Sequence, residues 1–589
     1  MSTIKTKAFH VLIAAAAVAG LAVVGTQSVG AGGRTEGESS PPAGQPDHGA
    51  AVVSSHELAT EAGIAILQDG GSAADAAVAV AAVLSVTEPW FSSVLGGGTW
   101  AIYHHAASNS VKALDGVGPA GSNASPEAFE QIASQSGMHQ AVVPGAWAGW
   151  MEWLKEYGRL ELGEILAPAI EHAEAGVAVT AEMQLWLQIE SENVAEWPSA
   201  RSIYMPDGEF LSQGDTVYQT DLAESFRALV DAYETARSGG RRHALDAAND
   251  YFYRGPLAEA IVDYSNRFGG YLTLDDFRRF NAQLEDPISI DYNGITVYQN
   301  PPNSQGAAML LALNILKGFD LSSYHPDSSE AIHLQTEAIK LGHVDKYYHI
   351  GDPDRVDVPV ASLLSDEHAE RQRQRISSDS VLEWPIEDIL QVDPDIEARN
   401  TTTFHVVDAD GNAAAVTTSL GAQFLVIGDT GIHINNRMRM MAVADGDPNQ
   451  IEPGKRVRHT SNPYMATVDG RPYILGGNTG VDTQPQGQVQ QFISVVEFGL
   501  DPQQAVSRPR FLTTAFPSAR VPWTADNTLA LEEGISDEVM QELAAIGHQV
   551  NRDGLWGNAN MIVIDPASRS VETGADHRGG VGKGMVLQQ

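Results

Sequence analysis

Residues 400–420 read NTTTFHVVDADGNAAAVTTSL, and this stretch decides the prediction of the fold. Two runs of strand-forming residues flank Asp410-Gly411, which is a strong signal for a tight hairpin turn. A two-residue loop would place Thr402 opposite Ser419, whereas a three-residue loop would place Thr401 opposite Ser419. Either register gathers hydroxyl groups at the far end of the hairpin. Thr and Ser pairs are ordinary in sheets, so the hairpin alone does not indicate catalysis.

The chain on both sides of the hairpin has the pattern of a layered α/β protein. Apolar periodicity predicts helices at residues 56–68, 72–86, 144–157, 160–176, 307–316, 329–348, 488–498, 502–507 and 536–546. Strands are predicted early in the chain at 51–55, after Gly98 and at 289–298, and later at 401–408, 413–420, 431–435, 464–468 and 473–475. We therefore expect an α/β fold whose sheets draw strands from both ends of the chain.

Composition excludes several functional classes. The 589 residues carry a net charge of −39, which repels nucleic-acid phosphates and anionic membranes, so we expect no nucleic-acid partner. The chain has no Cys, which rules out disulfides, a Cys nucleophile and Cys ligands to a metal. Only nine of the basic residues are Lys. Such an acidic, Lys-poor composition is typical of a salt-adapted protein or simply of a very soluble one.

The amino terminus has the features of a secretory signal. Lys5 and Lys7 precede an apolar run of about 15 residues, and small residues follow at 28–31. The run is shorter than the roughly 20 residues that span a bilayer. We expect residues 1–32 to be a cleaved signal peptide and residues 33–48 a flexible linker. The mature protein is then secreted or periplasmic, with no membrane anchor.

A series of short motifs accompanies the hairpin. They are GGSAADAAVA from Gly70, GGG from Gly96, VPGAWAGW from Val143, NPPNSQG from Asn300, DVPV from Asp357, Asn435-Asn436, GKR from Gly454, GQVQQ from Gly487 and PRF from Pro509. Their order and spacing over residues 50–580 resemble the γ-glutamyltranspeptidase family of N-terminal-nucleophile hydrolases. That resemblance implies a four-layer αββα sandwich built from both halves of the chain.

The resemblance also implies that the chain cleaves itself. Members of the family cut their own backbone directly before a Thr, and the match places this Thr at Thr401. The cleavage site is then the bond between Asn400 and Thr401. The expected products are a large subunit, residues 49–400, and a small subunit, residues 401–589, which stay together as a heterodimer.

The same resemblance assigns the chemistry. Thr401 is the nucleophile that forms an acyl-enzyme, and its freed α-amine, with an ordinary pKa of about 7.7–8.0, is its own general base. Ser419 matches the hydroxyl that orients the nucleophile. Gly480 and Val481 stand where the family has a Gly-Gly turn whose N–H groups stabilise the oxyanion. The Val N–H remains a donor if its φ is allowed. No metal or organic cofactor is implied.

The substrate pocket departs from the family pattern. The segment that begins Leu114-Asp115 lacks the Arg that holds the γ-glutamyl α-carboxylate, and His459 and Thr460 replace two Ser. Arg437 and Met440 replace the Gln and Asp that hold the α-amine, so a substrate ammonium group would be repelled. We therefore expect the residues that carry out the reaction to be present, whereas those that bind the γ-glutamyl group are replaced.

These features predict an enzyme that hydrolyses or transfers an acyl group from a small amide or peptide, with water or an amine as acceptor. The acyl group is γ-glutamyl in the family. One alternative is a family acylase for amides without the α-amino acid head, such as glutaryl or other dicarboxylic monoamides. Arg437, with Arg439 or Arg458, would attract their carboxylate. Another alternative is a secreted binding protein that keeps the fold but has lost catalysis.

Histidines of the predicted helix at 329–348 do not form a ligand set by themselves. His333 and Glu337 lie one turn apart, whereas His343 and His349 lie on other faces of the helix. A single pair is not a ligand set, so we expect no metal site.

Overall fold

The hairpin of residues 402–419 lies at the centre of the fold. The computed structural model describes residues 49–386 and 401–587, apart from residues 134, 422, 518–525 and 555–556. The predicted signal peptide and linker, and Asn400, lie outside the described residues. Within the described ranges, no helix combines the length and the apolar character that a bilayer crossing requires.

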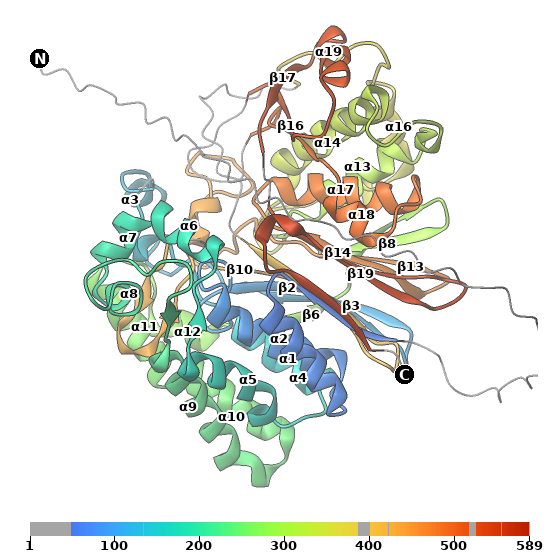
Figure 1. Cartoon of the computed structure of the whole chain (residues 1–589). Helices are drawn as coiled ribbons and strands as arrows, with labels where there is room; N and C mark the ends of the chain where they lie inside the picture. The colour runs from blue at the N-terminus through green and yellow to red at the C-terminus, as the bar shows by residue number, and fades with distance from the viewer. Residues whose placement is uncertain are drawn as a thin grey trace, which may run out of the picture. The chain divides into compact units, whose positions relative to one another are not determined.

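The hairpin strands β9 (Thr402–Val407) and β10 (Ala413–Ser419) form the middle of an antiparallel sheet (Figure 1). Strands β1 and β2 from the start of the chain flank them, and β20 from its end pairs with β1. The prediction that sheets draw on both ends of the chain is therefore confirmed. Within the described residues the order is β20-β1-β9-β10-β2-β3-β6, where β1 is Ala50–Ser54, β2 Gly98–His105, β3 Ser110–Gly116, β6 Gln283–Glu285 and β20 Lys583–Leu587.

The pairing of β9 with β10 settles the register of the hairpin. Thr402 pairs with Thr418, which is the register of the three-residue loop and not that of the two-residue loop. Continuing this register by one step places Thr401 opposite Ser419.

The carboxylate of Asp408 explains why the loop has three residues. Its Oδ1 accepts the N–H of Asn412 (2.9 Å), and Gly411 takes a φ of 85°, which favours glycine. Its Oδ2 accepts the N–H of Ala73 (2.9 Å) at the start of α2 (Ala73–Thr87). The loop is thereby tied to a helix of the other part of the chain.

A second antiparallel sheet contains the late strands together with one early hairpin. The predicted single strand at 289–298 is wrong, because Asn293 and Gly294 both have positive φ (53° and 89°) and form a two-residue turn. Within the described residues the order is β19-β18-β14-β13-β8-β7, where β7 is Ile288–Tyr292, β8 Ile295–Gln299, β13 Tyr464–Val468, β14 Arg471–Asn478, β18 Ala559–Ile564 and β19 Val571–Ala575.

Three apolar cores show how sheets and helices pack. One core joins the facing sides of the two sheets through residues such as Val53, Ala415 and Leu475. A second core joins the first sheet to helices that include α1 (Glu57–Gln68), α2, α4 (Ala146–Tyr157) and α5 (Leu162–Ala175). A third joins the second sheet to α13 (Ala307–Leu316), α14 (Ser329–His349), α17 (Thr483–Val496), α18 (Pro502–Ser507) and α19 (Asp537–Ala545) (Figure 1). Helix α2 is buried along its whole length, as its Ala-rich sequence predicts.

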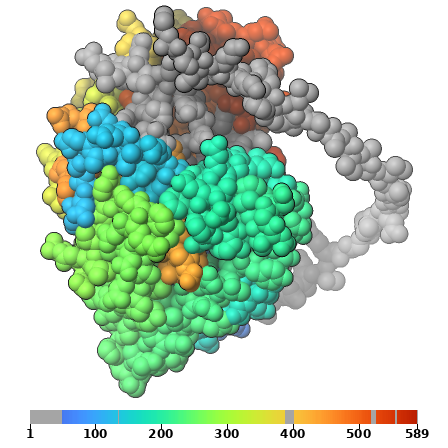
Figure 2. Space-filling model, turned by 90° about the vertical axis from the view of Figure 1, so that its left-hand side faces the viewer, coloured from blue at the N-terminus to red at the C-terminus, as the bar shows by residue number. Residues whose placement is uncertain are grey.

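Helices from the middle of the chain surround a segment of the late half. The short 3₁₀ turn Gly428–Thr430 contacts α8, α9 and α11, and Figure 2 shows an orange area of this later part of the chain enclosed by green helices. The two halves of the chain thus interlock. The helices of this region and the remaining short ones are α3 Pro126–Glu130, α6 Ala181–Ile189, α7 Ser191–Glu196, α8 Pro198–Tyr204, α9 Thr220–Ala236, α10 Arg241–Tyr253, α11 Pro256–Arg267, α12 Leu274–Arg279, α15 Val360–Leu363 and α16 Asp366–Arg373.

Three small sheets complete the described structure. They are β4 (Val177–Ala178) with β5 (Thr216–Val217), β11 (Val426–Ile427) with β12 (Ile432–His433), and β15 (Phe511–Thr513) with β16 (Thr528–Leu531) and β17 (Gln549–Arg552).

Candidate active site

The hydroxyl of Thr401 lies against that of Ser419 at the end of the central hairpin. Thr401 directly precedes β9 and is buried, and its Oγ1 lies 3.1 Å from Ser419 Oγ. The neighbouring hydroxyls point elsewhere: Thr402 Oγ1 donates to Ser55 Oγ (3.1 Å), and Thr403 Oγ1 donates to the Val416 carbonyl (2.9 Å). Of the three consecutive Thr, the one at 401 is therefore the one that meets Ser419.

Arg437 extends this pair of hydroxyls into a chain of hydrogen bonds. It begins a 3₁₀ turn (Arg437–Met440) and is buried, with 1% of its surface exposed. Its Nη1 donates to Ser419 Oγ (2.8 Å), and its Nη2 donates to Asn436 Oδ1 (2.6 Å). Because Ser419 accepts a bond from Arg437, its hydroxyl can donate its own proton to Thr401. The guanidinium thus places a positive charge two hydrogen bonds away from Thr401 Oγ1, the predicted nucleophile.

Gln484 is a neighbour of Thr401 that the sequence analysis missed. Its Nε2 donates to Thr401 Oγ1 (3.2 Å) and to the carbonyl of Gly480. It lies in the first turn of α17, which begins at Thr483 rather than at the predicted residue 488, because Pro485 is tolerated in a first turn. The amide of Gln484 thus links Thr401 to the turn that the resemblance predicts as the oxyanion hole.

The turn at Gly480-Val481 has the backbone that its sequence requires. The positive φ at this turn belongs to Gly480 (101°), whereas Val481 is not among the residues with positive φ. The β-branched side chain is therefore placed without the strain that a positive φ would cause. The turn leads into α17, whose first N–H groups create a positive potential at this end.

Two side chains from the early part of the chain contact the Gly480-Val481 turn and the Asp482 that follows it. Gln305 Nε2 donates to the carbonyls of Thr460 (2.6 Å) and Val481 (2.9 Å). Lys346 Nζ, on α14, forms an ion pair with Asp482 Oδ1 (2.6 Å) and is almost completely buried. Burial lowers the pKa of Lys346, and the neighbouring Asp482 partly offsets this.

His459 lies beside the same centre, whereas the hydroxyl of Thr460 makes no contact that indicates a role. A Cβ built on Gly98, the partner of Ser419 in the sheet, would lie 3.6 Å from His459 Nε2. Burial and then the nearby Arg437 lower the pKa of His459, so its imidazole is neutral. Thr460 Oγ1 is buried without a partner among the described residues.

Arg456 and Arg458, which precede His459 in the chain, make their contacts away from Thr401. Arg458 Nη1 donates to the carbonyls of Tyr347 (3.0 Å) and Ile350 (3.2 Å) at the end of α14. Arg456 pairs with Asp115 (2.8 Å) and Asp352 (3.0 Å). Asp115, from the segment that lacks the family's Arg, is thus neutralised by an Arg from another part of the chain.

Comparisons with known proteins identify the family to which the chain belongs. A family model described as Gamma-glutamyltranspeptidase matches residues 59–586. The Glutathione hydrolase-like YwrD proenzyme of Bacillus subtilis (strain 168) is 34% identical, over 90% of this chain and 97% of its own. The Acylase ACY 1 proenzyme of Pseudomonas sp. (strain SE83) is 32% identical, over 87% of this chain and 90% of its own.

A solved structure supports the same relationship. The crystal structure of cephalosporin acylase from Bacillus halodurans superimposes with a TM-score of 0.79 at 29% identity, covering 93% of this chain and 98% of that one. The family resemblance predicted from the motifs is confirmed, and so is the mixed α/β fold over most of the chain. The chain therefore belongs to the gamma-glutamyltranspeptidase family and is a glutathione hydrolase-like enzyme.

Proposed function

We propose that the protein is a self-processing amidase with an N-terminal nucleophile, Thr401, in a four-layer αββα sandwich. The observation that carries this proposal is the 3.1 Å contact between Thr401 Oγ1 and Ser419 Oγ, beside Arg437 and Gln484. Relatives named as proenzymes, such as the acylase of Pseudomonas, support the self-processing step. The large subunit would be residues 49–400 and the small subunit residues 401–589.

Maturation would begin with attack of Thr401 Oγ1 on the carbonyl carbon of Asn400. The C–N bond breaks as the acyl group moves to oxygen, and water then hydrolyses the resulting ester. The products are the Asn400 carboxylate and a free α-amine on Thr401. This amine is the base that the mature enzyme needs, because its ordinary pKa lies near neutrality.

Turnover would repeat the same chemistry on a substrate amide. The α-amine takes the hydroxyl proton while Oγ1 bonds to the amide carbon, and the carbonyl electrons move to oxygen. The N–H groups of Gly480 and Val481 stabilise this oxyanion. Collapse expels the amine, which takes the proton from the α-ammonium group. Water or an amine acceptor then releases the acyl group from the ester by the same steps.

Arg437 favours an acyl group that carries a carboxylate but no α-amine. Its guanidinium lies next to the reaction centre and would repel a substrate ammonium group, whereas it would attract a carboxylate. The Pseudomonas and Bacillus halodurans proteins described above are named acylases, which supports this choice. We therefore propose a glutaryl or similar dicarboxylic monoamide as the substrate class. The second candidate is a γ-glutamyl amide, as the glutathione hydrolases among the relatives suggest.

Steady-state kinetics on two matched anilides test this assignment. The two anilides differ only in the α-amino group of the acyl part. The mature protein should hydrolyse glutaryl anilide with a higher kcat/KM than γ-glutamyl anilide, because Arg437 would repel the α-ammonium group. A higher kcat/KM for the γ-glutamyl compound would show that another residue holds the α-amine. No turnover of either, together with an uncleaved chain, would favour an inactive binding protein.

Export of the mature protein also belongs to this proposal. Residues 1–32 would direct the chain out of the cytoplasm and be removed, and residues 33–48 would form a linker. Mass analysis of secreted protein should find a mature start near residue 33, and an intact Met1 would contradict it.

A further inference from the structure

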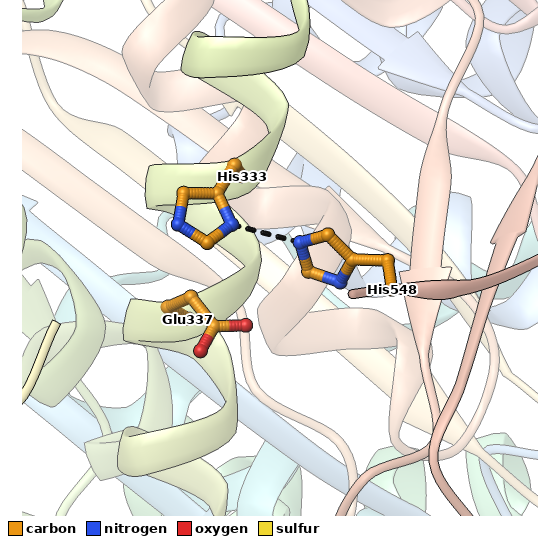
Figure 3. Close-up of side chains that lie close together, drawn as sticks. All are labelled: His333, Glu337 and His548. Carbon is orange, nitrogen blue, oxygen red and sulfur yellow. Dashed lines mark hydrogen bonds between the residues drawn. The ribbon is translucent and has the colours of Figure 1, made fainter. Parts of the chain in front are cut away.

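Two histidines and a glutamate meet far from the hairpin, outside the proposed active site. His333 and Glu337 lie one turn apart on α14, and His548 lies in the connection between α19 and β17. One ligand atom from each of the three lies within 4.8 Å of the others, and all three side chains are buried. Figure 3 shows them pointing toward a common point. His548 is 215 residues from His333, so the predicted pair gains a third member that its own helix could not supply.

The hydrogen bonds of His333 prepare it to bind a cation. Its Nε2 lies 2.7 Å from the carbonyl of Ser377, which can only accept, so Nε2 carries the proton. The lone pair of Nδ1 then faces His548 Nε2 at 2.8 Å. A histidine ligand whose other nitrogen donates to a backbone carbonyl is the usual arrangement in protein metal sites. Zinc–nitrogen bonds of about 2.0–2.1 Å with tetrahedral angles require about 3.3 Å between the two nitrogens, so the rings need to separate by only about half an ångström.

Glu337 supplies the anionic ligand, and Lys340 competes for it. Glu337 Oε2 accepts the N–H of Leu382 (2.6 Å), which fixes the carboxylate, and Oε1 accepts from Lys340 Nζ (2.8 Å). The Lys340 ammonium is buried beside the cluster and balances the charge of Glu337. A bound divalent cation would take over this role, so the Lys340 ammonium must turn away from Glu337 when the ion binds. Lys340 therefore competes with the ion and weakens the site.

We propose that His333, Glu337 and His548 bind one divalent transition-metal ion of the zinc class. Imidazole and carboxylate are ligands that suit zinc, and three protein ligands leave a fourth position for water. On binding, the proton on His548 Nε2 moves to its Nδ1, so that Nε2 can donate its lone pair to the ion. His548 keeps 6% of its surface exposed, which gives the ion an approach from that side.

The site is structural in this proposal and does not take part in the Thr401 reaction. Lys346, which supports the oxyanion turn, lies 13 residues beyond His333 on α14, which is about 20 Å along the helix. His333 and Glu337 precede residue 400 and His548 follows it. If the chain cleaves itself as proposed above, the ion joins the two products. Binding of the ion does not depend on that cleavage.

Metal binding by the full chain tests the proposal. The protein is stripped with a chelator and dialysed against micromolar Zn²⁺ with excess Mg²⁺, which occupies exposed carboxylates. Elemental analysis should find one zinc per chain, and zinc should raise Tm because it binds the folded state. Co²⁺ in place of zinc should give the visible absorption of a nitrogen-ligated site. Absence of stoichiometric zinc, or a cobalt spectrum like that of the free ion, overturns the proposal.

Two variants make the assignment specific. His548→Asn keeps a donor for His333 Nδ1 but loses the ligand, so zinc affinity should fall by about 100-fold. Lys340→Met removes the competing charge and should tighten binding by about tenfold. His104→Asn, a histidine outside the cluster, should bind zinc as the native chain does. Unchanged affinity in His548→Asn overturns the proposal. If that variant does not fold, Lys340→Met decides, since unchanged or weaker binding contradicts the site.

These tests remain separate from those of the proposed function. A chain that fails to cleave itself can still bind zinc, and a chain that cleaves itself can fail to bind it. Subunit separation in denaturant, measured with and without zinc, then reports whether the ion joins the products. Separation that zinc does not slow, despite stoichiometric binding, contradicts the joining role.

Discussion

Two groups of residues around Thr401 differ in how closely their sequence follows the family pattern. One group is Ser419 with the turn at Gly480, and the other is Arg437. Ser419 and Gly480, which match the family pattern in sequence, are linked to Thr401 directly or through Gln484. Arg437, in contrast, donates a hydrogen bond to Ser419 and stands at the position where the family pattern has the Gln that holds the substrate α-amine. If these residues act as proposed, the groups that break the amide bond and the group that selects the acyl chain can change independently, because Arg437 acts through its charge next to the hydroxyl of Ser419. Variants of Thr401 test the first group, and variants of Arg437 test the second.

The largest effect is expected from removal of the nucleophile. Thr401→Ala lacks the hydroxyl that attacks the preceding carbonyl, so the chain should run as one band on a denaturing gel. The native protein should give a fragment of 189 residues beside a larger one. Thr401→Ser keeps a hydroxyl and should still be cleaved, more slowly. Two bands from the Ala variant would assign processing to Thr402 or Thr403 instead.

Replacing Arg437 should change specificity more than chemistry. A charge-assisted hydrogen bond contributes about 1.5–3 kcal/mol, which corresponds to about 10- to 100-fold in kcat/KM. Arg437→Met should lose this much on glutaryl anilide and less on γ-glutamyl anilide, since repulsion of the ammonium is relieved. The ratio of the two kcat/KM values cancels any general loss of activity.

Arg439→Met tests the other arginine of the same turn, and a changed ratio in this variant would show that Arg439 also attracts the carboxylate. It should leave the ratio unchanged, because Arg439 makes no contact with Ser419 among the described interactions. An equal loss on both anilides in Arg437→Met would mean that Arg437 only orients Ser419.

Loosening the support behind the oxyanion turn should have a smaller effect. Lys346→Met removes the ion pair between Lys346 and Asp482 and should lower kcat by about tenfold with little change in KM. Adding Asp482→Asn removes the negative charge that Lys346 balanced and should restore part of kcat. A loss of Tm without a loss of kcat would indicate a purely structural pair. Lys317→Met, which breaks a surface pair with Asp366, is the control.

How much of this could be predicted depended on distance along the chain. The hairpin at residues 402–419 could be predicted because its turn signal and its strands are local in sequence. Its loop length could not, because it depends on the contacts of Asp408 with Asn412 and Ala73. The Asn293-Gly294 turn had the same kind of signal and was overlooked. Gln484, Lys346 and His548 meet their partners across 83, 136 and 215 residues, and no local pattern specifies such contacts. The roles of Thr401, Ser419, Gly480 and Val481 remain predictions from the resemblance, now with a geometry that suits them.

The smallest effect concerns Glu88, a buried carboxyl next to the side chain of Thr402. It follows α2 and is buried, and its Oε2 has no hydrogen-bond partner among the described residues. Burial raises the pKa of Glu88 from 4.5 to about 7, and the hydroxyl of Thr402, next to the nucleophile, partly counters this. Below about pH 4.5 the carboxyl is protonated in both the folded and the unfolded chain, so it costs no stability. Between pH 4.5 and 7 the unfolded chain ionises first, so stability is lost as the pH rises, and above pH 7 the loss is constant.

Glu88→Gln should therefore gain stability relative to the native chain as the pH rises. The gain should be absent near pH 4 and reach about 3 kcal/mol at most at pH 7 to 8, since each pKa unit corresponds to about 1.4 kcal/mol. Tm measured from pH 4 to 8 checks this, with Glu130→Gln, which replaces an exposed carboxyl on α3, as the control variant. Equal Tm differences at every pH would show that Glu88 is ionised in the folded protein, held by a charge or donor beside Thr402. The carboxyl would then belong to the electrostatics of the reaction centre and not only to the core below it.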